Sequence, residues 1–240
     1  MARKIVIVAP TLNEEENIGS FIAAVLLQNV EVLISDSHST DKTPEIVKVL
    51  AKKDSRVHYL DVKKRGLGLG LSEGIDYAVK KMGAEVIITM EADLSCSPEL
   101  LPQFIRKMEK HDAVIGSRYV SGGGITNWSW WRRGFSLGAN LILRIFAWAP
   151  RMHEFTNLYR AFSKEVLQDL APKISVHKDW LFVPAFTFEL LDTKFKVIEQ
   201  PIIYNDRFGG RSKMKTLSYT KNLLHYALRF RLKKLSLIHD

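Results

Sequence analysis

The sequence predicts an α/β fold, in which a mostly parallel sheet carries helices on both faces. In the first half of the chain, short apolar runs alternate with longer amphipathic stretches at the spacing of strand–helix units. The runs are apolar throughout, as in parallel strands that are buried on both faces. With 240 residues and 46% hydrophobic content, the chain can form a full core.

Five strands and four helices follow one another in the first 120 residues. The expected strands are the runs 4–10, 30–36, 57–62, 84–91 and 112–119. The expected helices are 13–28, 39–53, 71–83 and 97–111. Ser39, Thr40 or Asp41 can cap the second helix, Gly83 can end the third, and Pro98 suits the first turn of the fourth.

The second half of the chain departs from this alternation. Residues 121–133 form a loop, an apolar helical stretch follows at 137–150, and the last 20 or so residues predict a basic amphipathic helix. On that helix, Leu224, Ala227, Leu228 and Leu235 can share one face. We expect a single domain, residues 1–215, with a C-terminal extension, residues 216–240.

The net charge of +9 is concentrated near the C-terminus, where residues 207–240 hold nine Lys and Arg against one acid. A basic tail suggests a membrane, a nucleic acid or a phosphate substrate as its partner. The single cysteine, Cys96, excludes an internal disulfide and suits a reducing compartment. No apolar run reaches the roughly 20 residues of a membrane span.

Acidic residues follow several of the expected strands, at the sheet edge where parallel folds bind ligands. Glu91 and Asp93 fall on the same side of an extended segment and could hold one Mg²⁺ or Mn²⁺. Taken alone, the pair is weak evidence for a metal, and a place in the cap of the helix at Pro98 is the more common reason for such acids. The glycine-rich segment 65–74 lacks a Walker A pattern and predicts a flexible loop, although Lys63, Lys64 and Arg65 could serve a phosphate.

Seven segments, in order along the chain, resemble motifs of one enzyme family. They are APTLNEEENI, SDSHSTDKT, RGLGLGLSEGIDYA, MEADLSCSPELLPQFI, GSRYVSGGG with the W, RR and GAN that follow, TNLYRAF, and PIIYNDRFGGRSK. The chain thus resembles glycosyltransferase family 2 enzymes of GT-A fold, in particular the dolichol-phosphate mannosyltransferase-like group that acts on polyprenyl phosphates. The resemblance implies a nucleotide-sugar half, residues 1–120, and an acceptor half, residues 121–215.

The resemblance also assigns site residues. Glu91 and Asp93 match the metal-binding D-x-D motif, for Mg²⁺ or Mn²⁺, and Arg160 matches a further motif arginine. The implied donor-binding residues are Pro10, Asn13, Glu14, Asp36, Arg65 and Ala92. The implied acceptor-phosphate residues are Arg118, Arg132, Ser136, Arg207 and Lys213. Of these, Asp93, Arg118 and Arg132 are the expected catalytic residues.

The expected reaction is inverting transfer of a sugar, mannose favoured, from GDP-mannose or a UDP-sugar to a polyprenyl or dolichyl phosphate. A phosphate oxygen is already ionised, so it needs no general base, but its charge must be balanced by a metal and guanidinium groups. The alternatives are a family 2 enzyme that glycosylates a saccharide hydroxyl, and a non-catalytic nucleotide-sugar or nucleic-acid binding protein. Acidic strand ends argue against nucleic acid as a partner.

Several residues depart from the family pattern and bear on donor and acceptor identity. They are Ser37, His38, Glu91, Asn157, Leu158 and Ala185. Because the acceptor is a lipid, we expect peripheral association with the cytoplasmic side of a membrane, through the basic tail, Phe230 and the tryptophans at 128, 130 and 131. Packing of the tail on the domain or on a membrane-anchoring partner subunit, and of the tryptophans over the loop, remain alternatives.

Overall fold

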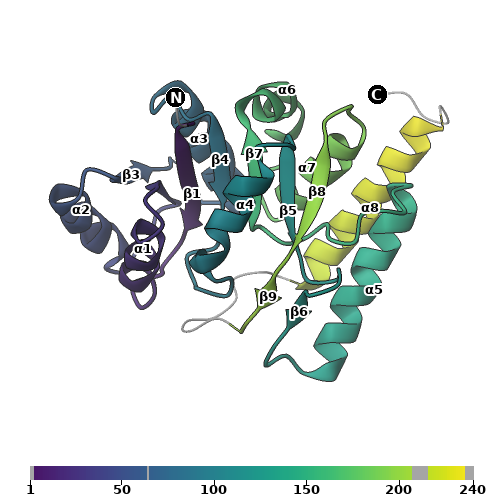
Figure 1. The fold of residues 1–240 in the computed structure, drawn as a ribbon. Coiled ribbons are helices and arrows are strands. Elements are labelled where there is room, and N and C mark those ends of the chain that lie inside the picture. Colours follow the sequence, from purple (N-terminus) through teal and green to yellow (C-terminus); the bar gives the residue numbers. More distant parts are fainter. Residues whose placement is uncertain (1–2, 64, 207–215, 236–240) are drawn as a thin grey trace.

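A seven-stranded sheet forms the centre of the protein, which we describe from a computed structural model covering residues 3–63, 65–206 and 216–235 (Figure 1). The strand order is β3-β2-β1-β4-β7-β5-β8, and only β7 runs antiparallel to its neighbours within this sheet. A separate parallel pair, β6-β9, lies below the main sheet in Figure 1. The predicted α/β fold with a mostly parallel sheet is confirmed.

The elements have the following bounds. The strands are β1 Ile5–Thr11, β2 Glu31–Asp36, β3 Val57–Asp61, β4 Val86–Thr89, β5 Ala113–Ser117, β6 Gly124–Ile125, β7 Arg160–Ser163, β8 Val197–Pro201 and β9 Ile203–Tyr204. The helices are α1 Ile18–Leu26, α2 Thr43–Lys53, α3 Leu67–Lys80, the 3₁₀ turn η1 Pro98–Leu100, α4 Leu101–Lys107, α5 Trp130–Phe146, α6 Lys164–Ile174, α7 Phe182–Leu191 and α8 Thr216–Lys234.

Side chains that alternate along β1 divide the interior into two layers. Val6 and Val8 belong to the apolar cluster that α3, α6 and α7 complete. Ile7 and Ala9 point to the opposite face and pack with α1, α2 and α4. Both faces of the sheet are therefore covered, which explains why its strands are apolar at every position.

All five strands expected in the first half form, but two expectations about helices were wrong. The third helix begins at Leu67 rather than Leu71, so most of the glycine-rich segment is helical and not a flexible loop. The second helix has Lys42 at its N-cap position, without a side-chain cap, while Asp41 accepts a hydrogen bond from the backbone N–H of Thr43 at 2.9 Å. The antiparallel β7, inserted between β4 and β5, was not anticipated.

The C-terminal helix α8 packs on the domain, beside α5 and α7 (Figure 1). Leu223 and Ala227 are buried, and the ring of Phe230 lies 5.0 Å from that of Phe188. The expected shared apolar face was wrong: Ala227 packs inward, whereas Leu224, Leu228 and Leu235 are exposed. Among the described residues, no helix is both long enough and apolar enough to span a bilayer.

Candidate active site

The carboxyl ends of β1 and β2 are joined by side-chain hydrogen bonds. Asn13, in the left-handed region at φ 54°, accepts through Oδ1 a hydrogen bond from the backbone N–H of Thr40 at 2.7 Å. Its own backbone N–H donates to Ser39 Oγ at 2.8 Å, and that of Glu14 donates to Thr43 Oγ1 at 2.8 Å. These bonds fix the loop after β1 against the loop after β2, next to Pro10 at the end of the sheet.

Asp36, at the end of β2, is 1% exposed, and its carboxylate accepts hydrogen bonds within the carboxyl edge of the sheet. It accepts hydrogen bonds from the backbone N–H and the hydroxyl of Ser39, and from the Tyr59 hydroxyl at 3.2 Å. The carboxylate therefore shapes the loop after β2. Direct contact of Asp36 with a donor remains a prediction.

Two departures from the family pattern connect this loop to the segment after β3. Ser37 donates from its hydroxyl to the Gly66 carbonyl at 3.3 Å. His38, at φ 60°, places Nε2 2.6 Å from the Lys63 carbonyl, and Arg65 donates to the His38 carbonyl at 3.4 Å. Arg65 thus lies beside the loop after β2, and its contact with a donor stays a prediction.

Close backbone packing explains the glycines at the start of α3. A Cβ on Gly66 would lie 2.4 Å from the Lys178 carbonyl oxygen, and one on Gly68 would lie 2.2 Å from that of His177. No larger residue fits at either position without moving the backbone. The segment around residue 178 therefore covers the beginning of α3.

The carboxylates of Glu91 and Asp93 follow directly after β4, in the middle of the sheet. Asp93 is buried, and its Oδ1 accepts a hydrogen bond from the backbone N–H of Ser95 at 3.0 Å. The helical turn at Pro98 is capped instead by Ser97, whose hydroxyl accepts from the backbone N–H of Glu99. Capping therefore does not account for the carboxylate pair.

The negative field of this pair acts on its neighbours. Burial raises the pKa of the Tyr204 hydroxyl, and the charges of Glu91 and Asp93 raise it further. The pKa of the Cys96 thiol is raised by burial first and by Glu91 next. Two hard oxygen donors at the carboxyl end of a central strand suit a divalent cation whose shell a substrate diphosphate completes. Among the described residues, no group of three His, Cys, Asp or Glu side chains converges as a closed metal site.

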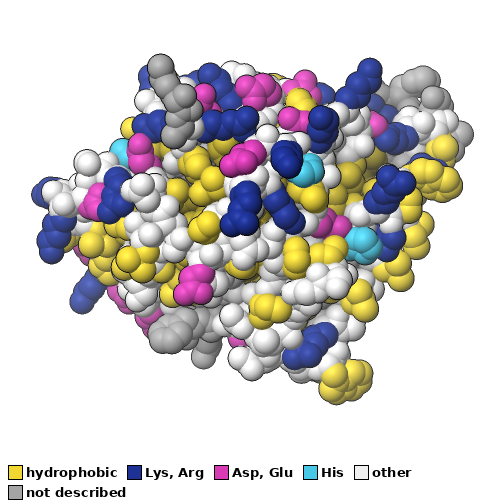
Figure 2. All heavy atoms as spheres, in the orientation of Figure 1, with side chains coloured by type: hydrophobic (Ala, Val, Ile, Leu, Met, Phe, Trp, Pro, Cys, Tyr) yellow, Lys and Arg dark blue, Asp and Glu magenta, His cyan; other side chains and the backbone are white. Residues whose placement is uncertain are grey.

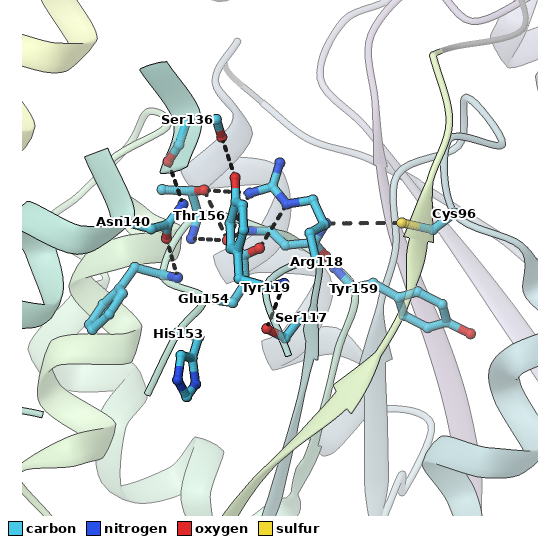
Figure 3. A network of polar contacts seen from close by, with 12 residues as sticks. Cys96, Ser117, Arg118, Tyr119, Ser136, Asn140, His153, Glu154, Thr156 and Tyr159 are labelled. Carbon is cyan, nitrogen blue, oxygen red and sulfur yellow. Dashed lines mark hydrogen bonds and ion pairs between the residues drawn. The ribbon is translucent and has the colours of Figure 1, made fainter. Parts of the chain in front are cut away.

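Arg118 and Glu154 form a buried ion pair (Figure 3). Arg118 donates from Nε and Nη2 to the two oxygens of Glu154 at 2.7 and 2.8 Å, and the two side chains are 5% and 0% exposed. Glu154 also accepts hydrogen bonds from the backbone N–H groups of Thr156 and Asn157. Arg118 was expected to handle acceptor phosphate, and the structure shows that most of its charge is already balanced by Glu154.

An aromatic cluster lies beside this ion pair. The Arg118 guanidinium is 5.4 Å from the centre of the Tyr204 ring and 5.9 Å from that of Trp128. The guanidinium of Arg132 also stacks on Trp128, 3.7 Å from the centre of the indole ring. The same guanidinium forms an ion pair with Asp206 at 3.3 Å. The side chain of Arg132 is 41% exposed, so it is the accessible cation of the two.

Two further residues of the matched motifs, Ser136 and Arg160, form hydrogen bonds that support the aromatic cluster and its surroundings. The Tyr119 hydroxyl donates to Ser136 Oγ at 2.7 Å (Figure 3). Arg160 is fully buried and donates to the carbonyls of Asn157, Val183 and Phe155 and to the hydroxyl of Thr187. Burial lowers the pKa of Arg160 to about 10. It joins the loop that carries Glu154 to α7.

The structure thus gathers Glu91, Asp93, Arg118 and Arg132 around Tyr204 and Trp128, and leaves Asn13, Asp36 and Arg65 at the neighbouring edge of β1 to β3. Arg207 and Lys213 lie outside the described residues. Sequence reasoning missed Glu154, Tyr204 and Asp206 as parts of this site. Tyr204 and Asp206 fall within a matched motif, so their position was available as a signal, but no motif contains Glu154.

Comparison with known proteins agrees with this arrangement. The family model described as Glycosyl transferase family 2 matches residues 6–171. The chain belongs to this family. It is therefore a glycosyltransferase by sequence and by fold, as predicted from the seven motifs.

Two curated relatives extend over most of the chain. Polyprenol monophosphomannose synthase of Mycolicibacterium smegmatis is 34% identical over 88% of this chain and 81% of its own length. Dolichol-phosphate mannosyltransferase of Pyrococcus furiosus is 30% identical over 92% of this chain, which spans only 62% of that protein.

Solved structures of similar fold come from a more distant enzyme. Glucosyl-3-phosphoglycerate synthase of Mycobacterium tuberculosis, crystallised with Mn²⁺, UDP and phosphoglyceric acid, superposes with a TM-score of 0.69 at 16% identity, over 96% of this chain and 78% of that one. The same enzyme with Mg²⁺ and UDP gives a TM-score of 0.70 at 17% identity, over 100% of this chain and 81% of that one. At this identity the likeness concerns the fold.

Proposed function

We propose that this glycosyltransferase transfers mannose from GDP-mannose to a polyprenyl or dolichyl phosphate, with inversion at the anomeric carbon. The names of the two curated relatives support the sugar and the lipid acceptor. The observation that carries the proposal is the juxtaposition of a carboxylate pair, Glu91 and Asp93, with an arginine–aromatic cluster around Tyr204. The carboxylate pair suits a cation bound to the donor diphosphate, and the arginine–aromatic cluster suits the phosphate anion of the acceptor.

In the proposed reaction, an oxygen of the acceptor phosphate forms a bond to the anomeric carbon. The bond from that carbon to the diphosphate oxygen breaks, and GDP leaves with the electron pair. The attacking phosphate is already ionised at neutral pH, so no side chain has to remove a proton. Glu154 supports this assignment, because its oxygens are held by Arg118 and by backbone N–H groups and cannot act as a base.

The chain's own residues would bring the two anions together. Arg132, the exposed arginine of the cluster, would bind the acceptor phosphate. Arg118, beside Tyr204, would contribute only the part of its positive field that Glu154 does not balance. Glu91 and Asp93 would hold a Mg²⁺ or Mn²⁺ ion, which supplies Lewis-acid stabilisation of the departing diphosphate when bound.

Substitution of Asp93 tests the metal assignment. Asp93→Asn with excess Mn²⁺ should lower mannose transfer by about a hundredfold or more, because several kcal/mol of transition-state stabilisation depend on the cation. Asp76→Asn is the matched control, since Asp76 is exposed on α3 and pairs with Lys80 four residues away. Near-normal transfer by the Asp93 variant would contradict the assignment.

We further propose that the exposed face of α5 and α8 docks on the surface of an anionic membrane. Neither helix contains an acidic residue, and both carry Lys or Arg. The exposed apolar residues on or just after these helices include Trp130, Phe135, Leu141, Ile145, Trp148, Leu224 and Leu228. Figure 2 shows hydrophobic side chains along the edge where α5 lies, with Lys and Arg among them. Apolar and cationic groups together favour a lipid interface.

Vesicle sedimentation tests this surface. Ile145→Ser combined with Trp148→Ser should lower binding to vesicles rich in phosphatidylglycerol by at least about tenfold, since two large apolar side chains no longer enter the interface. Leu27→Ser is the control, because Leu27 is 82% exposed at the end of α1, away from both helices. Equal loss in both variants, or none in the first, would favour a partner subunit on α8 instead. The single cysteine supports placement on the cytoplasmic side.

A further inference from the structure

The indole N–H of Trp128 is buried and has no hydrogen-bond partner among the described residues. Tryptophan N–H groups that leave water nearly always find an acceptor, so an unpartnered one in a site calls for a physical explanation. Trp128 differs in this respect from Trp130, which follows it by two residues and is 85% exposed. Contact with lipid alone would not require the indole N–H of Trp128 to be buried.

Two guanidinium groups, each in an ion pair, lie beside Trp128 on the acceptor side of the site. Arg132 lies over its ring at 3.7 Å, Arg118 is 5.9 Å from the ring centre, and Tyr204 contacts it edge-on at 5.6 Å. An N–H donor on a ring that the Arg132 guanidinium covers favours an anionic acceptor of hydrogen bonds over a neutral one. Backbone carbonyls or hydroxyls do not fill that role in the described part of the chain.

Among the described residues, Arg132 forms an ion pair with Asp206. Their contact of 3.3 Å joins two side chains that are 41% and 48% exposed, so the pair is weakly held and can exchange. A phosphate can replace a carboxylate beside Arg132 without changing the sign of the charge there. It also brings more oxygens, one of which could turn toward the indole.

We propose that the Trp128 indole N–H donates a hydrogen bond to the phosphate of the prenyl phosphate acceptor, which takes the place of Asp206 beside Arg132. The proposal rests on the proposed function and deepens it, because it adds a binding residue for the acceptor. Trp128 is then a part of the acceptor site and not an anchor in the lipid. Its ring face positions Arg132, and its N–H selects an anion with an oxygen in reach.

Kinetic titration with farnesyl phosphate in detergent micelles tests the proposal without the contribution of membrane docking. Trp128→Phe keeps an aromatic face for Arg132 and removes the N–H. It should raise the KM for farnesyl phosphate about tenfold, as expected for loss of one hydrogen bond to a charged group. The KM for GDP-mannose and the melting temperature should stay close to wild type. Trp180→Phe, also at a half-buried tryptophan, should leave both KM values unchanged.

Asp206→Asn gives a second, opposite expectation. Removal of the competing carboxylate should lower the KM for farnesyl phosphate by about two- to fivefold, the strength of an exposed ion pair. A KM for farnesyl phosphate in Trp128→Phe that matches that of Trp180→Phe would overturn the proposal. A parallel rise in both KM values together with a lower melting temperature would also overturn it, since that pattern indicates a structural role only.

Indole NMR makes the test direct. In protein labelled with ¹⁵N-tryptophan, the chain gives five indole signals, and the one missing from Trp128→Phe belongs to Trp128. Farnesyl phosphate should shift that proton signal downfield, as a new hydrogen bond to an anion does. Binding detected by calorimetry with an unchanged Trp128 signal would overturn this inference alone. No binding of farnesyl phosphate by calorimetry would overturn both this inference and the proposed function.

Discussion

Replacement of Glu154 by glutamine should destabilise the protein strongly, although Glu154 is not expected to touch a substrate. The two oxygens of Glu154 accept hydrogen bonds from Arg118 at 2.7 and 2.8 Å, with both groups out of solvent. The variant leaves a buried guanidinium without its counter-charge and turns an amide N–H₂ toward it. Breaking a buried pair from one side costs about 3–5 kcal/mol. For a chain of this size, that lowers the melting temperature by about 6–20 °C.

Thermal unfolding followed by circular dichroism measures this effect. The control is Asp169→Asn, which breaks the exposed pair between Asp169 and Lys173 on α6 and should cost under about 1 kcal/mol. The double variant Arg118→Met with Glu154→Met removes both charges and should lose less than Glu154→Gln does. A melting temperature for Glu154→Gln within about 2 °C of wild type would refute the reasoning, because it would mean that the pair is not buried in solution.

Three other predictions concern stability. Although burial alone would raise the pKa of Glu154, Arg118 lowers it below the ordinary 4.5, so stability from this pair is complete above about pH 4.5 and falls as pH drops further. When the free energy of unfolding is measured against pH, Glu154→Gln should therefore lose less stability below pH 4.5 than wild type. Equal losses in the two proteins would contradict this. Gly68→Ala should cost about 1–3 kcal/mol in urea unfolding, because its Cβ meets the His177 carbonyl, whereas Gly19→Ala, with open space, should be neutral or stabilising; equal effects would contradict the packing argument. Arg160→Lys should lose at least about 2 kcal/mol, since an ammonium cannot reach three carbonyls and a hydroxyl from one position; unchanged urea unfolding would refute this.

Local pattern was sufficient to predict the first half of the fold. The strands β1 to β5 are short apolar runs, which is the pattern of parallel strands buried on both faces. Glu91 and Asp93 could be found in the same way, because the direction of β4 places them at the carboxyl edge of the sheet. The antiparallel β7 could not, since its four residues carry no signal for which neighbours they pair with.

Contacts between distant parts of the chain explain the rest. Arg118 and Glu154 are 36 residues apart, so nothing local in either segment showed that this arginine is already paired. By composition, the glycines at 66 and 68 are typical of a flexible loop. In the structure they are needed because the backbone near residue 178 packs so closely that a Cβ would not fit. The tail helix has a basic and apolar composition that fits either a membrane or the domain. Only the buried Leu223 and Ala227 show that one of its faces packs on the core.

The central claim, transfer of mannose to a lipid phosphate, is tested most directly by a radiolabelled transfer assay. The protein is incubated with labelled GDP-mannose, Mn²⁺ and a polyprenyl phosphate in detergent, with a panel of other GDP- and UDP-sugars in parallel. We predict that label from GDP-mannose moves into the organic phase only when the polyprenyl phosphate is present. Transfer that needs no lipid phosphate, or no transfer from any donor in the panel, would contradict the proposal.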